Sequence, residues 1–188
     1  MDHETSDEDE WALALVGDPS AFSRIFLRHR DRVFRHSFRL VPTATDADDA
    51  VATVFFETWR RRARIRFVEG SMLPWLLLTA TNVARNLRRS TARYRQLLDG
   101  LPLEQQELDP TRSSDDDAAT NALRRLSLND QRVITLCVLE DYSEADAADA
   151  LGVPKGTVKS RLSRAKRRLA ASLHESHQVH QLQIGELS

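Results

Sequence analysis

Apolar side chains recur at i, i+3 and i+4 along almost the whole chain, and no stretch keeps the alternation of a half-buried strand. This spacing predicts an all-α protein. We expect helices over about 20–41, 45–62, 73–90, 118–126, 130–140, 144–151 and 155–173. Ser20, which follows Pro19, is the expected N-cap of the first of these helices, and Pro42 is expected to end it.

The breaks between these segments predict two small helical domains joined by a flexible linker. The expected parts are an acidic N-terminal extension (1–10), a first domain (11–90), an acidic linker (91–118), a second domain (119–173) and a C-terminal tail (174–188). The linker contains Gly100, Pro102 and Pro110 and few large apolar residues after Leu108. We interpret the run Asp115–Asp117 as favourable charge at the start of the next helix rather than as a metal site.

Composition excludes several classes of protein. The chain carries 27 Lys and Arg against 28 Asp and Glu, and 41% of its residues are hydrophobic, as in an ordinary globular protein. Its longest apolar run, 72–80, is far shorter than the ~20 residues that span a bilayer. The acidic N-terminus is unlike a secretory signal, and Cys137 is the only cysteine, so no internal disulfide can form. We therefore expect a cytoplasmic protein with no membrane insertion.

Catalytic and metal motifs are not visible in the sequence. We find no Ser-His-Asp arrangement, no Gly-rich phosphate loop and no set of metal ligands, so we expect neither an enzyme nor a cofactor. His174, His177 and His180 have a spacing of three residues, which we interpret as part of an exposed helix or tail. The sequence predicts no metal site.

The sharpest local signal lies in residues 142–169. Ser143 and Asp146 have the spacing of a capping box, Gly152 supplies a tight turn, and Pro154 is tolerated where a new helix begins. This pattern predicts a helix-turn-helix.

The last helix of this motif has one apolar and one basic face. Val158, Leu162, Ala165 and Leu169 share a narrow arc that must be buried. The residues expected to contact duplex DNA are Lys155, Thr157, Lys159, Ser160, Arg161, Ser163, Arg164 and Arg167. Such a helix suits the major groove, where Arg and Lys donate to guanine edges and other cations hold phosphates.

A second set of polar residues lies on helix 73–90 and on the segment before it. Aromatic, amide and guanidinium groups in this arrangement can bind a nucleic-acid backbone and unstacked bases. The residues expected to contact a single strand are Arg60, Arg61, Arg64, Arg66, Phe67, Trp75, Asn82, Arg85, Asn86 and Arg89. A solvated polar stripe, with Trp75 as a core residue, is the alternative.

Four motifs follow one another along about 155 residues. They are Gly-Asp-Pro-Ser-Ala-Phe (17–22), Asp-Ala-Asp-Asp-Ala-Val (46–51) with Val54, Phe55 and Trp59, Leu-Pro-Trp-Leu (73–76) with Ala-Thr-Asn-Val (80–83), and the segment 151–162 of the helix-turn-helix. Together they resemble bacterial sigma factors, specifically the small two-domain extracytoplasmic-function group.

The resemblance implies a promoter-specificity subunit of RNA polymerase. Its expected partners are the clamp helices of the largest polymerase subunit, the flap of the second-largest subunit, duplex promoter DNA at the minus-thirty-five element, single-stranded DNA at the minus-ten element, and an anti-sigma factor. The loop 64–71 matches the specificity loop of the family, which captures a flipped base. The residues expected to meet the polymerase are Asp48, Asp49, Ala52, Thr53, Phe56 and Glu57. Family members usually carry Gln-Glu where this chain has Ala52 and Thr53.

The helix-turn-helix alone also suits a self-sufficient, dimeric DNA-binding regulator. Palindromic sites and binding without polymerase would favour that alternative. It leaves the first domain and its Arg-rich segment unexplained.

Overall fold

The computed structural model describes residues 5–97 and 114–185. Its elements are α1 (Asp7–Leu15), α2 (Pro19–Leu40), α3 (Ala44–Arg60), the 3-10 turn η1 (Arg62–Arg64), α4 (Leu73–Leu97), α5 (Ser114–Arg125), α6 (Leu128–Ile134), the π-helical turn η2 (Thr135–Leu139), α7 (Glu144–Leu151) and α8 (Lys155–Gly185). No strand occurs in these two ranges, and the predicted all-α class is confirmed.

Short polar side chains begin the helices of the N-terminal half. Ser6 and Thr43 each accept a hydrogen bond from the backbone N–H three residues later. Asp18 caps α2 by accepting from the N–H of Ser20, with Pro19 at the first helical position. The prediction that Ser20 is the cap was wrong, because the fixed backbone angle of Pro19 starts the helix before Ser20.

Helices α1 to α4 form a first module around an apolar core. Its buried residues are Trp11, Ile25, Val33, Ala50, Val51, Val54, Phe55, Met72, Leu76, Ala80 and Val83. Aromatic rings extend this core, with centroid distances of 5.7 Å between Trp11 and Trp59 and 4.8 Å between Phe26 and Phe55. Trp59 is 39% exposed because it lies at the rim of the cluster.

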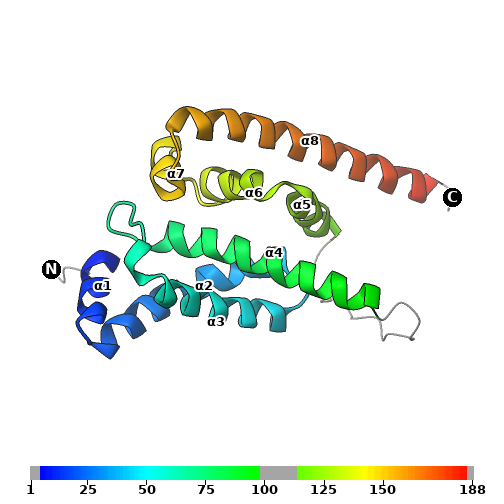
Figure 1. The fold of residues 1–188 in the computed structure, drawn as a ribbon. Coiled ribbons are helices and arrows are strands. Elements are labelled where there is room, and N and C mark those ends of the chain that lie inside the picture. Colours follow the sequence, from blue (N-terminus) through cyan, green and yellow to red (C-terminus); the bar gives the residue numbers. More distant parts are fainter. Residues whose placement is uncertain (1–4, 98–113, 186–188) are drawn as a thin grey trace.

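Helices α5 to α8 form a second module, and α8 lies along its outer side (Figure 1). Its apolar core is continuous with residues of the first module. The shared cluster contains Leu40, Val41, Ala47, Val68, Leu78 and Ala84 from the first module and Leu123, Leu126, Val133, Ile134, Leu136, Ala147, Ala148, Ala150, Val158, Leu162 and Ala165 from the second. The second module is short for a domain that folds alone, and contact with α2 and α4 increases the apolar area that it buries.

The helix-turn-helix has the predicted local structure. The Ser143 hydroxyl accepts from the backbone N–H of Asp146, whose carboxylate in turn accepts from the N–H of Ser143. Gly152 ends α7 with φ +65°, a left-handed conformation that favours glycine.

Several boundaries differ from those predicted. The expected extension 1–10 ends inside α1, whose Asp7 and Glu10 are each only 3% exposed. Helix α4 continues past residue 90 to Leu97, and α8 continues past residue 173 to Gly185. The helix expected over 130–140 changes from α-helical to π-helical geometry at Thr135. Most of the expected linker, residues 98–113, lies outside the described residues.

Candidate nucleic-acid interface

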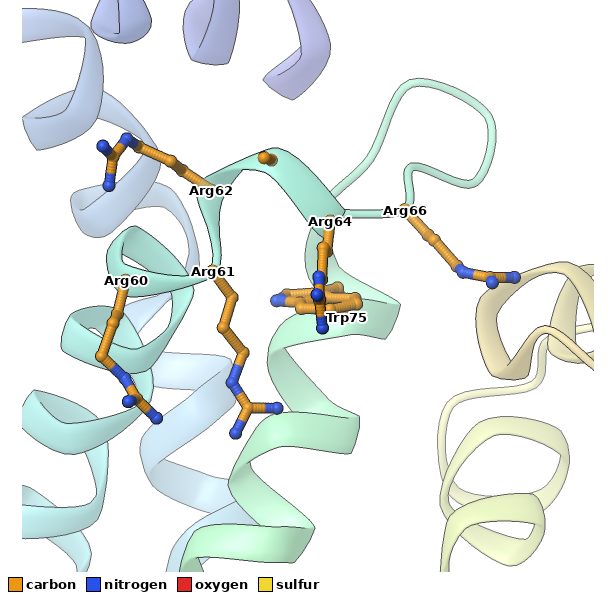
Figure 2. Close-up of a pocket in the computed structure, with 7 residues that line it drawn as sticks. Arg60, Arg61, Arg62, Arg64, Arg66 and Trp75 are labelled. Atoms are coloured by element: carbon orange, nitrogen blue, oxygen red, sulfur yellow. The ribbon is translucent and has the colours of Figure 1, made fainter.

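The segment between α3 and α4 borders an open hollow of about 870 Å³ (Figure 2). Its lining residues are Arg60, Arg61, Arg62, Ala63, Arg64, Arg66 and Trp75. Arg60 ends α3, η1 supplies Arg62 and Arg64, and Trp75 belongs to the first turn of α4. Guanidinium groups can bind phosphates, and an indole ring can stack on a base, so this hollow has the chemistry of a single-strand site.

Two of these arginines are paired with Glu57 of α3. The Glu57 carboxylate accepts hydrogen bonds from Arg60 Nη2 at 2.8 Å and from Arg61 Nε at 3.1 Å. The hydrogen bond from Arg60 is the largest of the effects that hold the pKa of Glu57 below its ordinary value. Glu57 therefore fixes the positions of two cations of the hollow and cancels part of their charge.

A second hollow of about 470 Å³ lies beside the first, between α3 and α4. The two hollows share Arg60 and Arg61. Asn82 and Asn86 of α4 and Thr53 of α3 also line the second hollow. The structure thus brings the predicted amides next to the predicted arginines.

Asn82 is engaged by the second module. Its Oδ1 accepts a 2.7 Å hydrogen bond from Nη2 of Arg132 on α6. Arg132 is half-buried, and burial, helped by the positive charge of Arg161, lowers its pKa. The bond joins a residue of the predicted single-strand site to the helix-turn-helix module.

Arg66 also contacts the second module. Its side chain points away from the other arginines toward α7 (Figure 2), where Nη1 donates a 3.2 Å hydrogen bond to the carbonyl of Asp149. A Cβ atom at Gly152 would lie 2.3 Å from this nitrogen, so any larger residue there would displace the Arg66 guanidinium group. Arg66 and Phe67 line a further hollow with residues of the second module.

The remaining predicted residues of this surface differ in exposure. Asn86 and Arg89 are exposed, whereas Arg85 and Trp75 are half-buried. The buried Nε1 of Trp75 has no hydrogen-bond partner among the described residues. Trp75 therefore packs against the core and also lines the hollow. Both interpretations that the sequence allowed, a core residue and a residue of the candidate single-strand site, fit this position.

Helix α8 presents the predicted basic face. Val158, Leu162 and Ala165 are buried and Leu169 is half-buried, as the apolar arc requires. The predicted contact residues Lys155, Lys159, Ser160, Ser163, Arg164 and Arg167 are exposed, and Thr157 and Arg161 are half-buried. Arg168 on the same helix instead donates a 2.5 Å hydrogen bond to the buried carboxylate of Asp130 on α6.

The outer face of α3 carries the residues predicted to meet the polymerase. Asp48, Asp49, Ala52 and Thr53 are exposed, and Glu57 is partly covered by its two arginines. Phe56 is 65% exposed, although aromatic rings favour burial. An exposed aromatic ring is typical of a surface that another protein covers.

Helix α1, which the sequence reasoning missed, contacts the backbone of the segment that lines the basic hollow. Trp11 Nε1 donates a 3.4 Å hydrogen bond to the carbonyl of Arg62. Asp7, Trp11 and Ala14 have the spacing of one buried helix face, which is the signal that could have revealed this helix.

Among the side chains that the structure describes, no group of three His, Cys, Asp or Glu residues could hold a metal ion. The side chains of His177 and His180 lie outside the described residues. No described helix is both long enough and apolar enough to cross a membrane.

Two family models match the chain. The model described as sigma-70 region 2 matches residues 25–94, and the model described as sigma-70, region 4, matches residues 116–169. The first match contains the basic hollow, and the second contains the helix-turn-helix.

Curated relatives and solved structures agree with these matches. The ECF RNA polymerase sigma factor SigM of Mycobacterium tuberculosis is 33% identical over 173 residues, which cover 91% of this chain and 86% of SigM. The sigma factor RpoE of Bartonella quintana, solved in complex with the anti-sigma factor NepR, has a TM-score of 0.56 at 28% identity and covers 81% of this chain and 96% of RpoE. CnrH, solved with the cytosolic domain of CnrY, has a TM-score of 0.61 at 24% identity over 90% of this chain and 97% of CnrH, and supports the fold.

Proposed function

This chain belongs to the extracytoplasmic-function group of sigma-70 factors, which are transcription initiation factors, and we propose that it directs core RNA polymerase to promoters. In this proposal the first module binds the polymerase and the separated minus-ten strand, and the second module reads the minus-thirty-five element as duplex. The chain performs no catalysis itself. One observation carries the proposal: the arginine- and tryptophan-lined hollow lies in the region 2 match, and the exposed basic face of α8 lies in the region 4 match.

The polymerase contact is assigned to the outer face of α3. Phe56 would supply apolar area, and Asp48 and Asp49 would supply charge that selects a basic surface on the clamp helices. The flap of the second-largest subunit would receive the second module, as the family resemblance implies.

The minus-ten strand is assigned to the two adjoining hollows. Extruding a base from the stack costs a few kcal/mol, so the surface that receives it must supply stacking and phosphate contacts. Trp75 offers a half-exposed ring, and Arg64 offers a cation beside it in the lining of the same hollow. The loop that ends at Ser71 would capture the extruded base.

The minus-thirty-five duplex is assigned to α8. Lys159, Ser160 and Arg164 occupy its exposed face, where side chains can reach base edges and phosphates. Each specific base contact of this kind is worth about 1 to 3 kcal/mol.

Binding of the minus-ten strand requires a change at the boundary of the two modules. Asn82 is bonded to Arg132, and Arg66 is bonded to the backbone of α7. Both bonds would be exchanged for contacts with DNA when the modules separate on the polymerase.

An anti-sigma factor is the further partner that we propose. The support is the similarity to RpoE, which was solved in complex with NepR, over both modules of this chain. Such a partner would hold the chain away from the polymerase until a signal releases it.

The test uses the full chain with core RNA polymerase and promoter fragments randomised in two windows about one and three helical turns upstream of the start. Core binding and initiated transcript are measured with and without the chain. We expect the chain to bind core polymerase and to enrich one short motif in each window. Binding to duplex DNA without any binding to the polymerase would overturn the proposal in favour of the self-sufficient regulator.

A further inference from the structure

The segment that joins α3 to α4 is held at both ends by α1. At its beginning, Nε1 of Trp11 donates to the carbonyl of Arg62 at 3.4 Å. At its end, the backbone N–H of Glu8 donates to the carbonyl of Gly70 at 3.2 Å. One N-terminal helix therefore spans residues 62–72, the segment that contains the loop 64–71 to which the proposed function assigns base capture.

The end of this segment is a tight turn that is packed against α1. Val68 and Ser71 exchange two backbone hydrogen bonds of 3.0 and 2.9 Å. The central residues Glu69 and Gly70 have φ values of +50° and +74°, which costs free energy at Glu69. A Cβ atom at Gly70 would meet Cβ of Ser6, the N-cap of α1, at 3.3 Å. A turn with such a backbone persists only where its surroundings hold it.

The carboxylate of Asp7 connects this turn to the rest of the first module. Its Oδ2 accepts hydrogen bonds from the backbone N–H of Met72 at 2.7 Å and from Oγ of Ser71 at 3.3 Å. On the other side it is bonded to two residues of α2, Arg28 Nη1 at 2.5 Å and His29 Nε2 at 2.6 Å. Asp7 is 3% exposed, so water does not compete for these bonds.

We infer that Asp7 is a positioning residue that sets the conformation of the base-capturing loop and so controls which minus-ten base is accepted. This inference rests on the proposed function, since it assigns a role to a residue that acts through the loop. Asp7 does not itself contact DNA. It fixes the point where the loop enters α4, and a loop fixed at that point presents one pocket shape instead of several.

Glu10 provides a matched control on the same helix. It is also 3% exposed, and its two carboxylate oxygens accept from Arg24 of α2 at 2.7 to 2.9 Å. It thus ties α1 to α2 as Asp7 does, but no described contact joins it to the loop. A purely structural role of buried carboxylates on α1 would give Asp7 and Glu10 variants the same effect.

The experiment compares Asp7→Asn and Glu10→Gln in the full chain bound to core polymerase. Transcripts from a promoter pool randomised in the minus-ten element give the base preference at each position, and the minus-thirty-five preference serves as an internal reference. We expect Asp7→Asn to reduce the preference at the captured base about fivefold, as for the loss of one or two hydrogen bonds, with the minus-thirty-five preference unchanged. We expect Glu10→Gln to keep both preferences.

Hydrogen exchange of the free variants supplies a readout that does not depend on the polymerase. Asp7→Asn is expected to accelerate exchange of the backbone N–H groups of residues 68–72, and Glu10→Gln is not. If Asp7→Asn fails to fold, Asp7→Glu keeps the charge beside Arg28 and His29 but moves the oxygen by one methylene relative to Met72.

The inference is overturned if the Asp7 and Glu10 variants show the same minus-ten base preference, whether both keep it or both lose it. Failure of the proposed function has a different signature. In that case the wild-type chain itself yields no base preference with the polymerase, while the exchange experiment still reports whether Asp7 holds the turn.

Discussion

Arg132 Nη2 on α6 donates a 2.7 Å hydrogen bond to Oδ1 of Asn82 on α4, and this bond links the second module to the surface proposed to bind a single strand. The Nε atom of Arg132 is buried without a partner among the described residues. The arginine therefore occupies a position that is unfavourable for a cation but that closes the two modules on each other.

Arg132→Ala is expected to release Asn82. We expect the free chain to bind a single-stranded minus-ten oligonucleotide about three- to fivefold more tightly, which corresponds to about 1 kcal/mol for one hydrogen bond. Fluorescence anisotropy at fixed salt measures the affinity. Arg125→Ala, which removes an exposed cation from α5, is the control for the loss of charge. If Arg132→Ala binds the oligonucleotide no more tightly than Arg125→Ala does, a closing role for Arg132 is contradicted.

Arg164→Ala and Asn82→Ala are expected to affect different steps of initiation. Arg164 lies on the exposed face of α8, so its loss should weaken minus-thirty-five duplex binding by about 1 to 3 kcal/mol and leave opening of a pre-formed complex unchanged. Asn82→Ala should impair opening, as measured with a fluorescent base in the minus-ten element. Equal losses at both steps in either variant would contradict this division.

Arg168→Ala distinguishes a structural cation of α8 from the cations that we propose contact DNA. Its partner Asp130 is buried, and the variant would leave that carboxylate without the 2.5 Å bond. Because Arg168 itself is mostly exposed, we expect a loss of only about 1 to 2 kcal/mol in the free energy of unfolding. Urea denaturation measures it. A fall in duplex specificity without a change in stability would place Arg168 among the DNA-reading residues instead.

His36 predicts a pH dependence of stability. It is fully buried on α2, with Nε2 2.9 Å from Oγ1 of Thr81. Burial, and then the positive charge of Arg39, lower the pKa of His36 from 6.5 to about 3. The unfolded chain therefore binds a proton at this residue between about pH 6.5 and 3 while the folded chain does not. Stability is expected to fall as the pH decreases through this window, by at most about 1.4 kcal/mol per pH unit.

His36→Leu tests this dependence by urea denaturation at pH values from 7 to 4. Thr81 keeps its hydrogen bond to the carbonyl of Leu77, so the variant leaves that hydroxyl with a partner. We expect a shallower decline of stability with falling pH in the variant. Asp7 does not obscure the result. Burial raises the pKa of Asp7, but the hydrogen bonds from His29, Met72 and Arg28 outweigh burial and lower this pKa to about 2. The stability that Asp7 contributes is therefore lost only as the pH falls from 3.8 through about 2. If the free energy of unfolding changes with pH equally in the variant and the wild type, His36 is excluded as the source of the pH dependence.

Phe56→Ala is expected to weaken binding to core polymerase. Removal of an aromatic ring from the centre of an interface typically costs 2 kcal/mol or more, so we expect roughly a thirtyfold loss of affinity. Leu27 on α2 has the same 65% exposure and is the matched control, because Leu27→Ala removes a similar apolar surface outside the α3 face. If the two substitutions reduce the affinity for core polymerase equally, the assignment of the polymerase contact to α3 is wrong.

Sequence periodicity was sufficient for the faces of individual helices. Val158, Leu162 and Ala165 are buried as their spacing requires, and the capping box of Ser143 and Asp146 forms as predicted. These features depend on residues a few positions apart, which interact whatever the rest of the chain does.

Contacts between distant residues could not be predicted in the same way. Asp7 and Glu10 belong to a run of charged residues that is typical of a solvated extension, yet both are buried because Arg28, His29 and Arg24 reach them from α2. The bond of Arg132 to Asn82 joins residues 50 positions apart. Neither pairing has a local signal, since each partner would also be an acceptable surface residue.

The shared apolar cluster of the two modules sets a condition on how this chain can be regulated. Separation of the modules would expose Leu78, Ala84 and their partners on α6 to water, which costs free energy and lowers the fraction of the free chain that is open. The apparent affinity for any partner that requires the open form is reduced by that fraction. An inhibitor that binds only the closed form would consequently need no contact with a promoter-reading residue, because mass action alone would withdraw the chain from transcription.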